Sequence, residues 1–121
     1  MLELSHKKLI AWQKAIQLLP LIYEVCNKLP KEEKETYNII SQMKRAGLSV
    51  SNNLAGGASR KTKPDKKRFF EISRSSVVEI DNCITASLVL NYLTEKDVVQ
   101  INNAILELFK LITGLIDSNN Q

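Results

Sequence analysis

Apolar residues recur every three or four positions along most of this chain, the spacing typical of amphipathic helices. The N-terminal third carries two such registers side by side. The first comprises Leu9, Trp12, Ile16, Leu19, Tyr23 and Cys26, and the second comprises Ala15, Leu18, Ile22, Val25 and Leu29. We interpret the stripe with Trp12 and Tyr23 as core. Two registers make an apolar face wider than one helix seam needs, which favours self-association.

Three further stripes follow with the same spacing. They comprise Ile40, Met43, Gly47, Val50 and Leu54, then Phe70, Ser73, Val77, Ile80, Ile84 and Leu88, and finally Val98, Ile101, Ile105, Leu108, Ile112 and Leu115. Helix ends are predicted from capping chemistry: Ser5, Thr62 and Thr94 as N-caps, and Gly56-Gly57 as the stop of the second helix. A glycine within a buried stripe, Gly47, indicates that another backbone comes close.

The pattern predicts helices at about residues 6–29, 34–56, 63–91 and 95–117. Short connections between helices of similar length place successive helices antiparallel. We therefore expect residues 1–121 to form a single all-α domain, an antiparallel up-down-up-down four-helix bundle.

Composition narrows the class of protein. The two cysteines, Cys26 and Cys83, lie far apart in apolar stripes, so we expect buried thiols and neither a disulfide nor a metal site. The first residues lack a signal-peptide core, and no apolar run approaches the ~20 residues that span a bilayer. These observations predict a cytoplasmic protein without a membrane partner.

Charge is unevenly distributed. Residues 42–74 hold nine basic residues against two acidic ones, whereas the rest of the chain holds eight against eleven. The basic set is Lys44, Arg45, Arg60, Lys61, Lys63, Lys66, Lys67, Arg68 and Arg74. Such a concentration favours a polyanion partner bound through phosphates, although a solvated helix face would carry the same pattern. Phe69 is the candidate for base stacking, while Phe70 lies in the core stripe.

Catalytic chemistry has little support in the sequence. The single histidine, His6, has no Glu-x-x-His context, and Gly56-Gly57 fits no phosphate-binding loop. Three acids of the third helix, Glu71, Glu79 and Asp81, could serve as proton carriers. However, Glu71 lies one turn from both Lys67 and Arg74, which favours an exposed ion-pair ladder. We predict a protein that is not an enzyme and needs no cofactor.

Several blocks together resemble a known family. They are residues 9–15 (LIAWQKA), 29–33 (LPKEE), 41–46 (SQMKRA), 50–57 (VSNNLAGG) with 60–61 (RK), 68–70 (RFF) and 74–79 (RSSVVE). In this order they resemble the four-helix bundle proteins encoded in intervening sequences of 23S ribosomal RNA genes. The accessory variability proteins of diversity-generating retroelements are related to that family.

The resemblance implies a homopentameric barrel whose positive surface contacts nucleic acid and, in retroelement members, a reverse transcriptase. The matching positions are Arg45, Asn53, Arg60, Lys61, Arg68 and Arg74. One departure concerns the family's usual glutamate, which is replaced here by Gly56. If that acid pairs with an arginine in the family, Arg45 or Arg74 is left freer in this chain.

The sequence therefore predicts a non-enzymatic oligomer that binds RNA or DNA. The predicted contact residues are Lys44, Arg45, Asn53, Arg60, Lys61, Lys63, Lys66, Lys67, Arg68 and Arg74. The alternative is an interaction scaffold, or an accessory subunit, whose basic face docks an acidic protein.

Overall fold

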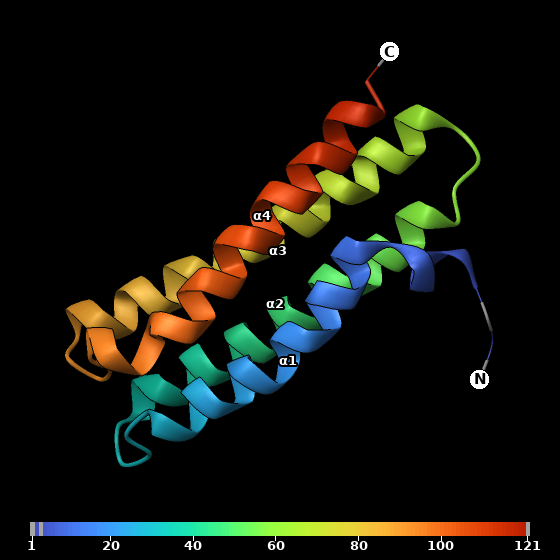
Figure 1. The fold of residues 1–121 in the computed structure, drawn as a ribbon. Coiled ribbons are helices and arrows are strands. Elements are labelled where there is room, and N and C mark those ends of the chain that lie inside the picture. The colour runs from blue at the N-terminus through green and yellow to red at the C-terminus, as the bar shows by residue number, and fades with distance from the viewer. Residues whose placement is uncertain (1, 3, 121) are drawn as a thin grey trace.

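Four long helices and two short 3₁₀ turns make up the computed structural model, which describes residues 2 and 4–120 (Figure 1). In chain order they are η1 (Ser5–Lys8), α1 (Ile10–Lys28), α2 (Lys34–Ala58), α3 (Lys63–Val89), η2 (Glu95–Val98) and α4 (Val99–Ser118). The described residues contain no strand. Each helix runs opposite to the one before it, so the expected antiparallel four-helix bundle is confirmed.

Sequence neighbours are also neighbours in space. Each helix contacts the next, α4 closes the bundle against α1, and the α2–α3 contact is the most extensive of these. The connection from α2 to α3, the N-terminal segment and the C-terminal end of α4 gather at one end of the bundle (Figure 1). We call this the α2–α3 end. The other two connections lie at the opposite end.

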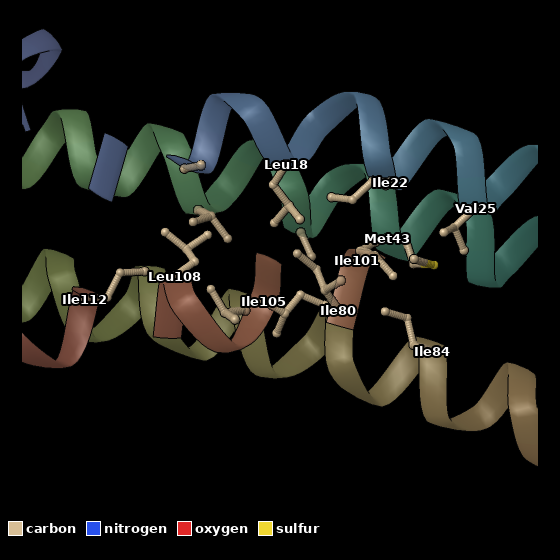
Figure 2. Close-up of a cluster of buried hydrophobic side chains, with 14 of the residues drawn as sticks. Leu18, Ile22, Val25, Met43, Ile80, Ile84, Ile101, Ile105, Leu108 and Ile112 are labelled. Atoms are coloured by element: carbon tan, nitrogen blue, oxygen red, sulfur yellow. The ribbon is translucent and has the colours of Figure 1, made fainter. Parts of the chain in front are cut away.

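One buried stripe from each helix forms the core. Figure 2 shows side chains of α1 and α2 facing those of α3 and α4, among them Leu18, Met43, Ile80 and Leu108. Each of these four is at most 1% exposed. Burial of whole aliphatic side chains contributes about 1.5–3 kcal/mol apiece, which makes this stripe the main source of stability.

The two registers predicted for the first helix have different environments. The register with Ala15, Leu18 and Ile22 is fully buried, as expected. The other faces outward in part: Tyr23 is 50% exposed, and Trp12 is half-buried. The interpretation of Tyr23 as core is therefore wrong, because a bundle of four helices covers only about a third of each helix's circumference.

The helix starts agree with the predicted caps at two of three positions. Thr62 Oγ1 accepts a hydrogen bond from the Asp65 backbone N–H at 3.3 Å, and Thr94 forms a capping box with Asp97. Ser5 does not cap a helix: it begins η1, and α1 starts only at Ile10, without a side-chain cap.

The end of the second helix differs from the prediction. It continues through Gly56 and Gly57 to Ala58, and no described glycine has a positive φ. Gly56 and Gly57 allow close packing of Phe69 and Phe70 on α2 and do not form a left-handed turn. Gly47 likewise faces side chains of α1: a Cβ there would lie 2.5 Å from Ile22 Cδ1 and 3.2 Å from Leu19 Cδ2.

The last helix has one property that the sequence reading missed. By length and composition alone, Glu95–Ser118 could span a bilayer, with a mean hydropathy of 1.3 over an 18-residue window. In this structure, however, the helix packs into the bundle through a stripe that includes Ile101, Ile105 and Ile112. Of that 18-residue window, 28% is buried inside the bundle.

Candidate nucleic-acid interface

The connection between α2 and α3 is short and held at both sides. Ser59 is the C-cap of α2, and Thr62 is the N-cap of α3. Pro64 lies in the first turn of α3, where a backbone N–H would have no partner within the helix, so its absence costs no hydrogen bond. Lys66 Nζ donates a hydrogen bond to the Ala58 carbonyl at 3.1 Å. This bond ties the first turn of α3 to the last turn of α2, so the basic residues of the connection are presented on a defined corner.

Two glycines seat a pair of aromatic rings behind that corner. A Cβ on Gly57 would lie 2.6 Å from Phe70 Cε1, and one on Gly56 would lie 3.2 Å from Phe69 Cδ1. Phe70 is 2% exposed, which confirms it as core. Because neither glycine has a side chain, both rings can pack directly onto α2.

Phe69 is only half-buried, and its ring is covered by cations. The guanidinium carbon Cζ of Arg60 lies 4.4 Å from the ring centroid, and that of Arg68 lies 4.8 Å from it. Such cation–π contacts hold long side chains in place at little desolvation cost. The ring is therefore not a bare stacking surface for a base. It is a support for two arginines.

Six of the predicted contact residues are brought together here. They are Arg60, Lys61, Lys63, Lys66, Lys67 and Arg68, all in the connection or the first turns of α3. The one acid among them is Asp65, whose Oδ1 lies 3.9 Å from Arg68 Nη2 between two exposed side chains. A surface pair of this kind contributes little and leaves the local charge strongly positive.

Sequence reasoning missed two members of this basic surface. Lys7 and Lys8 belong to η1, which contacts α2 and lies at the same end of the bundle (Figure 1). A surface pocket there is shared by Ser5, Ala58, Lys66 and Asn119, which shows that η1 meets the adjoining ends of α2, α3 and α4. The sequence separates these lysines from the corner by about fifty residues, so only tertiary structure could reveal the addition.

The other four predicted residues lie along the helices, away from the corner, and have partners. Lys44 Nζ sits 4.3 Å from the centroid of the Tyr23 ring. Asn53 Nδ2 donates to the Ser49 backbone carbonyl at 2.9 Å, within α2. Asn53 and Lys44 are thus engaged in contacts within the bundle.

The two arginines that the loss of an acid at Gly56 was expected to leave freer are also engaged. Arg45 Nη2 lies 3.3 Å from Glu79 Oε2, and it bonds the Gln42 side chain as well. Arg74 donates to Thr113 Oγ1 at 3.1 Å and lies over Phe109, which joins α3 to α4. Both arginines therefore have other side-chain partners in this structure.

The acids of α3 do not converge on a reactive site. Glu79 pairs with Arg45, and Asp81 borders an apolar groove. The ladder predicted from Glu71 to Lys67 and Arg74 is not present among the described ion pairs, because Arg74 turns towards α4. Within residues 2 and 4–120, no cluster of three His, Cys, Asp or Glu could hold a metal ion.

Both thiols are free, as the sequence predicted. Cys26 is buried and Cys83 half-buried. Burial raises the pKa of each, and it outweighs the opposing effects of Lys44 on Cys26 and of Arg45 on Cys83. A raised pKa keeps a thiol protonated and therefore a poor nucleophile at neutral pH.

Comparison with known proteins places the chain in a family. No curated protein matches it. The family described as 23S rRNA-intervening sequence protein matches residues 7–114, which include every block on which the resemblance was based. It is a family of small helical proteins with no known catalytic function. The chain belongs to the 23S rRNA-intervening sequence protein family.

Proposed function

We propose that this protein binds RNA or DNA through the phosphates, without catalysis, and does so as a homo-oligomer. The contact surface is the α2–α3 end of the bundle, defined by Lys7, Lys8, Arg60, Lys61, Lys63, Lys66, Lys67 and Arg68. The family match supports a connection with ribosomal RNA genes but assigns no ligand.

The observation that carries the proposal is the uneven charge along the bundle. At the α2–α3 end, residues 4–8, 59–68 and 115–120 hold eight basic side chains and two acids. At the opposite end, residues 28–35 and 94–97 hold four basic side chains and five acids. A field concentrated at one end attracts a polyanion and gives affinity through counterion release.

Self-association is supported by apolar surface that the single chain leaves uncovered. A groove of about 310 Å³ between α3 and α4 is lined by Val78, Leu106 and Phe109 among others, which are 53%, 55% and 37% exposed. On α1, Tyr23 and Ile10 are also exposed. Apolar side chains gathered on a surface favour contact with another protein surface, here a second copy.

A charge-reversal variant tests the nucleic-acid proposal. Arg60→Glu, Lys61→Glu and Lys67→Glu together should abolish binding of a labelled RNA at moderate salt, measured by fluorescence anisotropy. The matched control is Lys31→Glu, Lys34→Glu and Lys96→Glu, which changes net charge equally at the opposite end. It should bind within about twofold of the unaltered protein, because its lysines lie too far away to contact the same phosphates.

Thermal unfolding of both variants provides the structural control, since these side chains are exposed or half-buried. Unchanged affinity of the first variant would refute the assignment of this surface. Equal loss in both variants would show that total charge decides binding and location does not.

The alternative partner is an acidic protein docked on the same basic surface. Salt weakens both kinds of complex, so salt dependence does not separate them. Affinity purification with and without nuclease treatment does. Material that co-purifies only before digestion supports the nucleic-acid proposal, whereas a protein partner that survives digestion supports docking of an acidic surface.

A further inference from the structure

We propose that the cluster of Arg60, Phe69 and Arg68 selects unpaired nucleotides, so that the protein prefers single-stranded over double-stranded nucleic acid. This inference rests on the proposed function and names its substrate class. It differs from binding by charge alone, in which lysines and arginines are equivalent and strand state matters only through phosphate spacing.

The first support for the proposal is the fixed position of the ring. Phe69 packs against α2, where an added Cβ on Gly56 would lie 3.2 and 3.3 Å from Cδ1 and Cε1 of the ring. Its own Cβ lies 3.1 Å from the position that a Cβ on Gly57 would take. The Phe69 ring of α3 is thus a rigid platform that packs on the backbone of α2.

The second support for the proposal is the pair of arginines that lie over the Phe69 ring. Their Cζ atoms lie 4.4 and 4.8 Å from the ring centroid, distances at which a guanidinium stacks on an aromatic ring. Arg60 is exposed and has no ion pair among the described residues. Arg68 is 61% exposed at its side chain and has only the long contact to Asp65.

A supported guanidinium offers two different contacts. Its N–H edge forms paired hydrogen bonds with a phosphate, and its free face stacks on a nucleobase. In a duplex the base faces are already stacked on one another, so they are not accessible to the face of an arginine. In a single strand, bases can turn out and use the arginine face as well.

The surrounding lysines supply charge without this second contact. Lys61, Lys63 and Lys67 carry compact ammonium groups, which attract phosphates of either strand state. The preference for unpaired nucleotides is therefore assigned to the two arginines and their ring, while total affinity depends on the whole basic surface.

The test replaces the arginines while keeping their charge. The double variant Arg60→Lys and Arg68→Lys is compared with Arg45→Lys and Arg74→Lys, the same chemical change away from the corner. The probes are a 20-nucleotide RNA of mixed, unstructured sequence and the same strand annealed to its complement. Dissociation constants are measured by anisotropy at several salt concentrations.

We expect the corner variant to weaken binding of the single strand about five- to tenfold. Duplex binding should change less than about twofold, and the salt slope should stay the same, because the number of positive charges is unchanged. The control variant should leave both constants unaltered. A second variant, Phe69→Leu, keeps an apolar contact on Gly56 but removes the ring, and it should lose the same preference.

The outcomes separate this inference from the proposed function. Failure of the unaltered protein to bind either probe would overturn both. If the corner variant weakens binding of both probes equally, or weakens binding of neither, the single-strand preference is overturned. Phosphate binding by the basic surface would then still stand. Thermal unfolding of each variant shows that an affinity change is not a loss of fold.

Discussion

At the scale of single residues, a glycine has to be interpreted by what surrounds it. Gly57 and Gly114 both lie within helices, where the sequence alone assigns each the same penalty of about 1 kcal/mol relative to alanine. Their surroundings are opposite. Gly57 lies against the Phe70 ring and the Cβ of Phe69, whereas a Cβ on Gly114 would meet nothing within 4 Å.

We predict opposite effects for the same substitution at these two sites. Gly57→Ala should destabilise the protein by about 1–3 kcal/mol, because the new methyl group would meet Phe70 Cε1 at 2.6 Å and this ring is fully packed. Gly114→Ala should stabilise it by about 0.5–1 kcal/mol through helix propensity. Urea unfolding midpoints measure both, and a stabilised Gly57→Ala variant would contradict the packing described here.

At the scale of elements, the caps position the helices that carry function. The start of the segment leading into α4 depends on Asp97, whose carboxylate accepts hydrogen bonds from Thr94 N at 2.8 Å and Thr94 Oγ1 at 2.9 Å. The backbone bond, followed by the side-chain bond and by Lys28, holds the pKa of Asp97 below its ordinary value of 3.8. The ionised form is therefore the one that stabilises this turn.

The pH dependence of stability follows from the direction of that shift. Because the pKa of Asp97 is lowered in the folded state, its carboxylate adds to the free energy of unfolding. This contribution is complete above the ordinary pKa of 3.8 and is lost as the pH falls through the lower pKa of the folded state. Asp97→Asn should therefore be less stable than the unaltered protein at pH 7, and the difference should shrink towards pH 2.

Urea unfolding at pH 7, 4 and 2 measures this convergence. Glu95→Gln, which removes a carboxylate from the same turn, serves as the matched control and should have a smaller effect at pH 7. A gap between Asp97→Asn and the unaltered protein that stays constant across this range would show that the charge of Asp97 is irrelevant to the cap.

At the scale of the whole molecule, two surfaces remain after the core is built. One is the basic α2–α3 end, and the other is the apolar groove between α3 and α4. They involve different residues, so binding and self-association can be altered separately. A homo-oligomer would also multiply the basic surface, and linked copies bind a long polyanion more tightly than one copy does.

We predict that Leu106→Glu disrupts self-association without unfolding the chain. Leu106 lines the groove and is 55% exposed, so a charge there costs little in the single chain but much at an apolar interface. Light scattering should show a smaller particle for this variant. Asn103→Glu adds the same charge to an exposed position of α4 outside the groove and should leave the particle size unchanged.

Much of the fold could be predicted from the sequence because helix periodicity and capping are local. The four helices, their order and the caps at Thr62 and Thr94 all follow from residues within one or two turns of each other. The family resemblance also depended only on order along the chain, and the match over residues 7–114 confirms it.

The candidate site was only partly predictable. Six basic residues close in sequence remain close in space whatever the rest of the chain does. In contrast, two arginines contact residues more than thirty positions away in the sequence. Arg45 pairs with Glu79, and the Arg74 side chain donates a hydrogen bond to Thr113. Charge counting along the chain cannot distinguish such engaged cations from those left facing solvent.

By itself, the sequence determined which faces of the helices are apolar and where positive charge is concentrated, because both are properties of neighbouring residues. Only the tertiary structure decided which of the two apolar registers of α1 is buried, since that depends on the other three helices. It also decided that Gly56 and Gly57 seat two rings instead of ending α2, and that Lys7 and Lys8 join the basic end. These outcomes depend on contacts between distant segments, which local pattern does not encode.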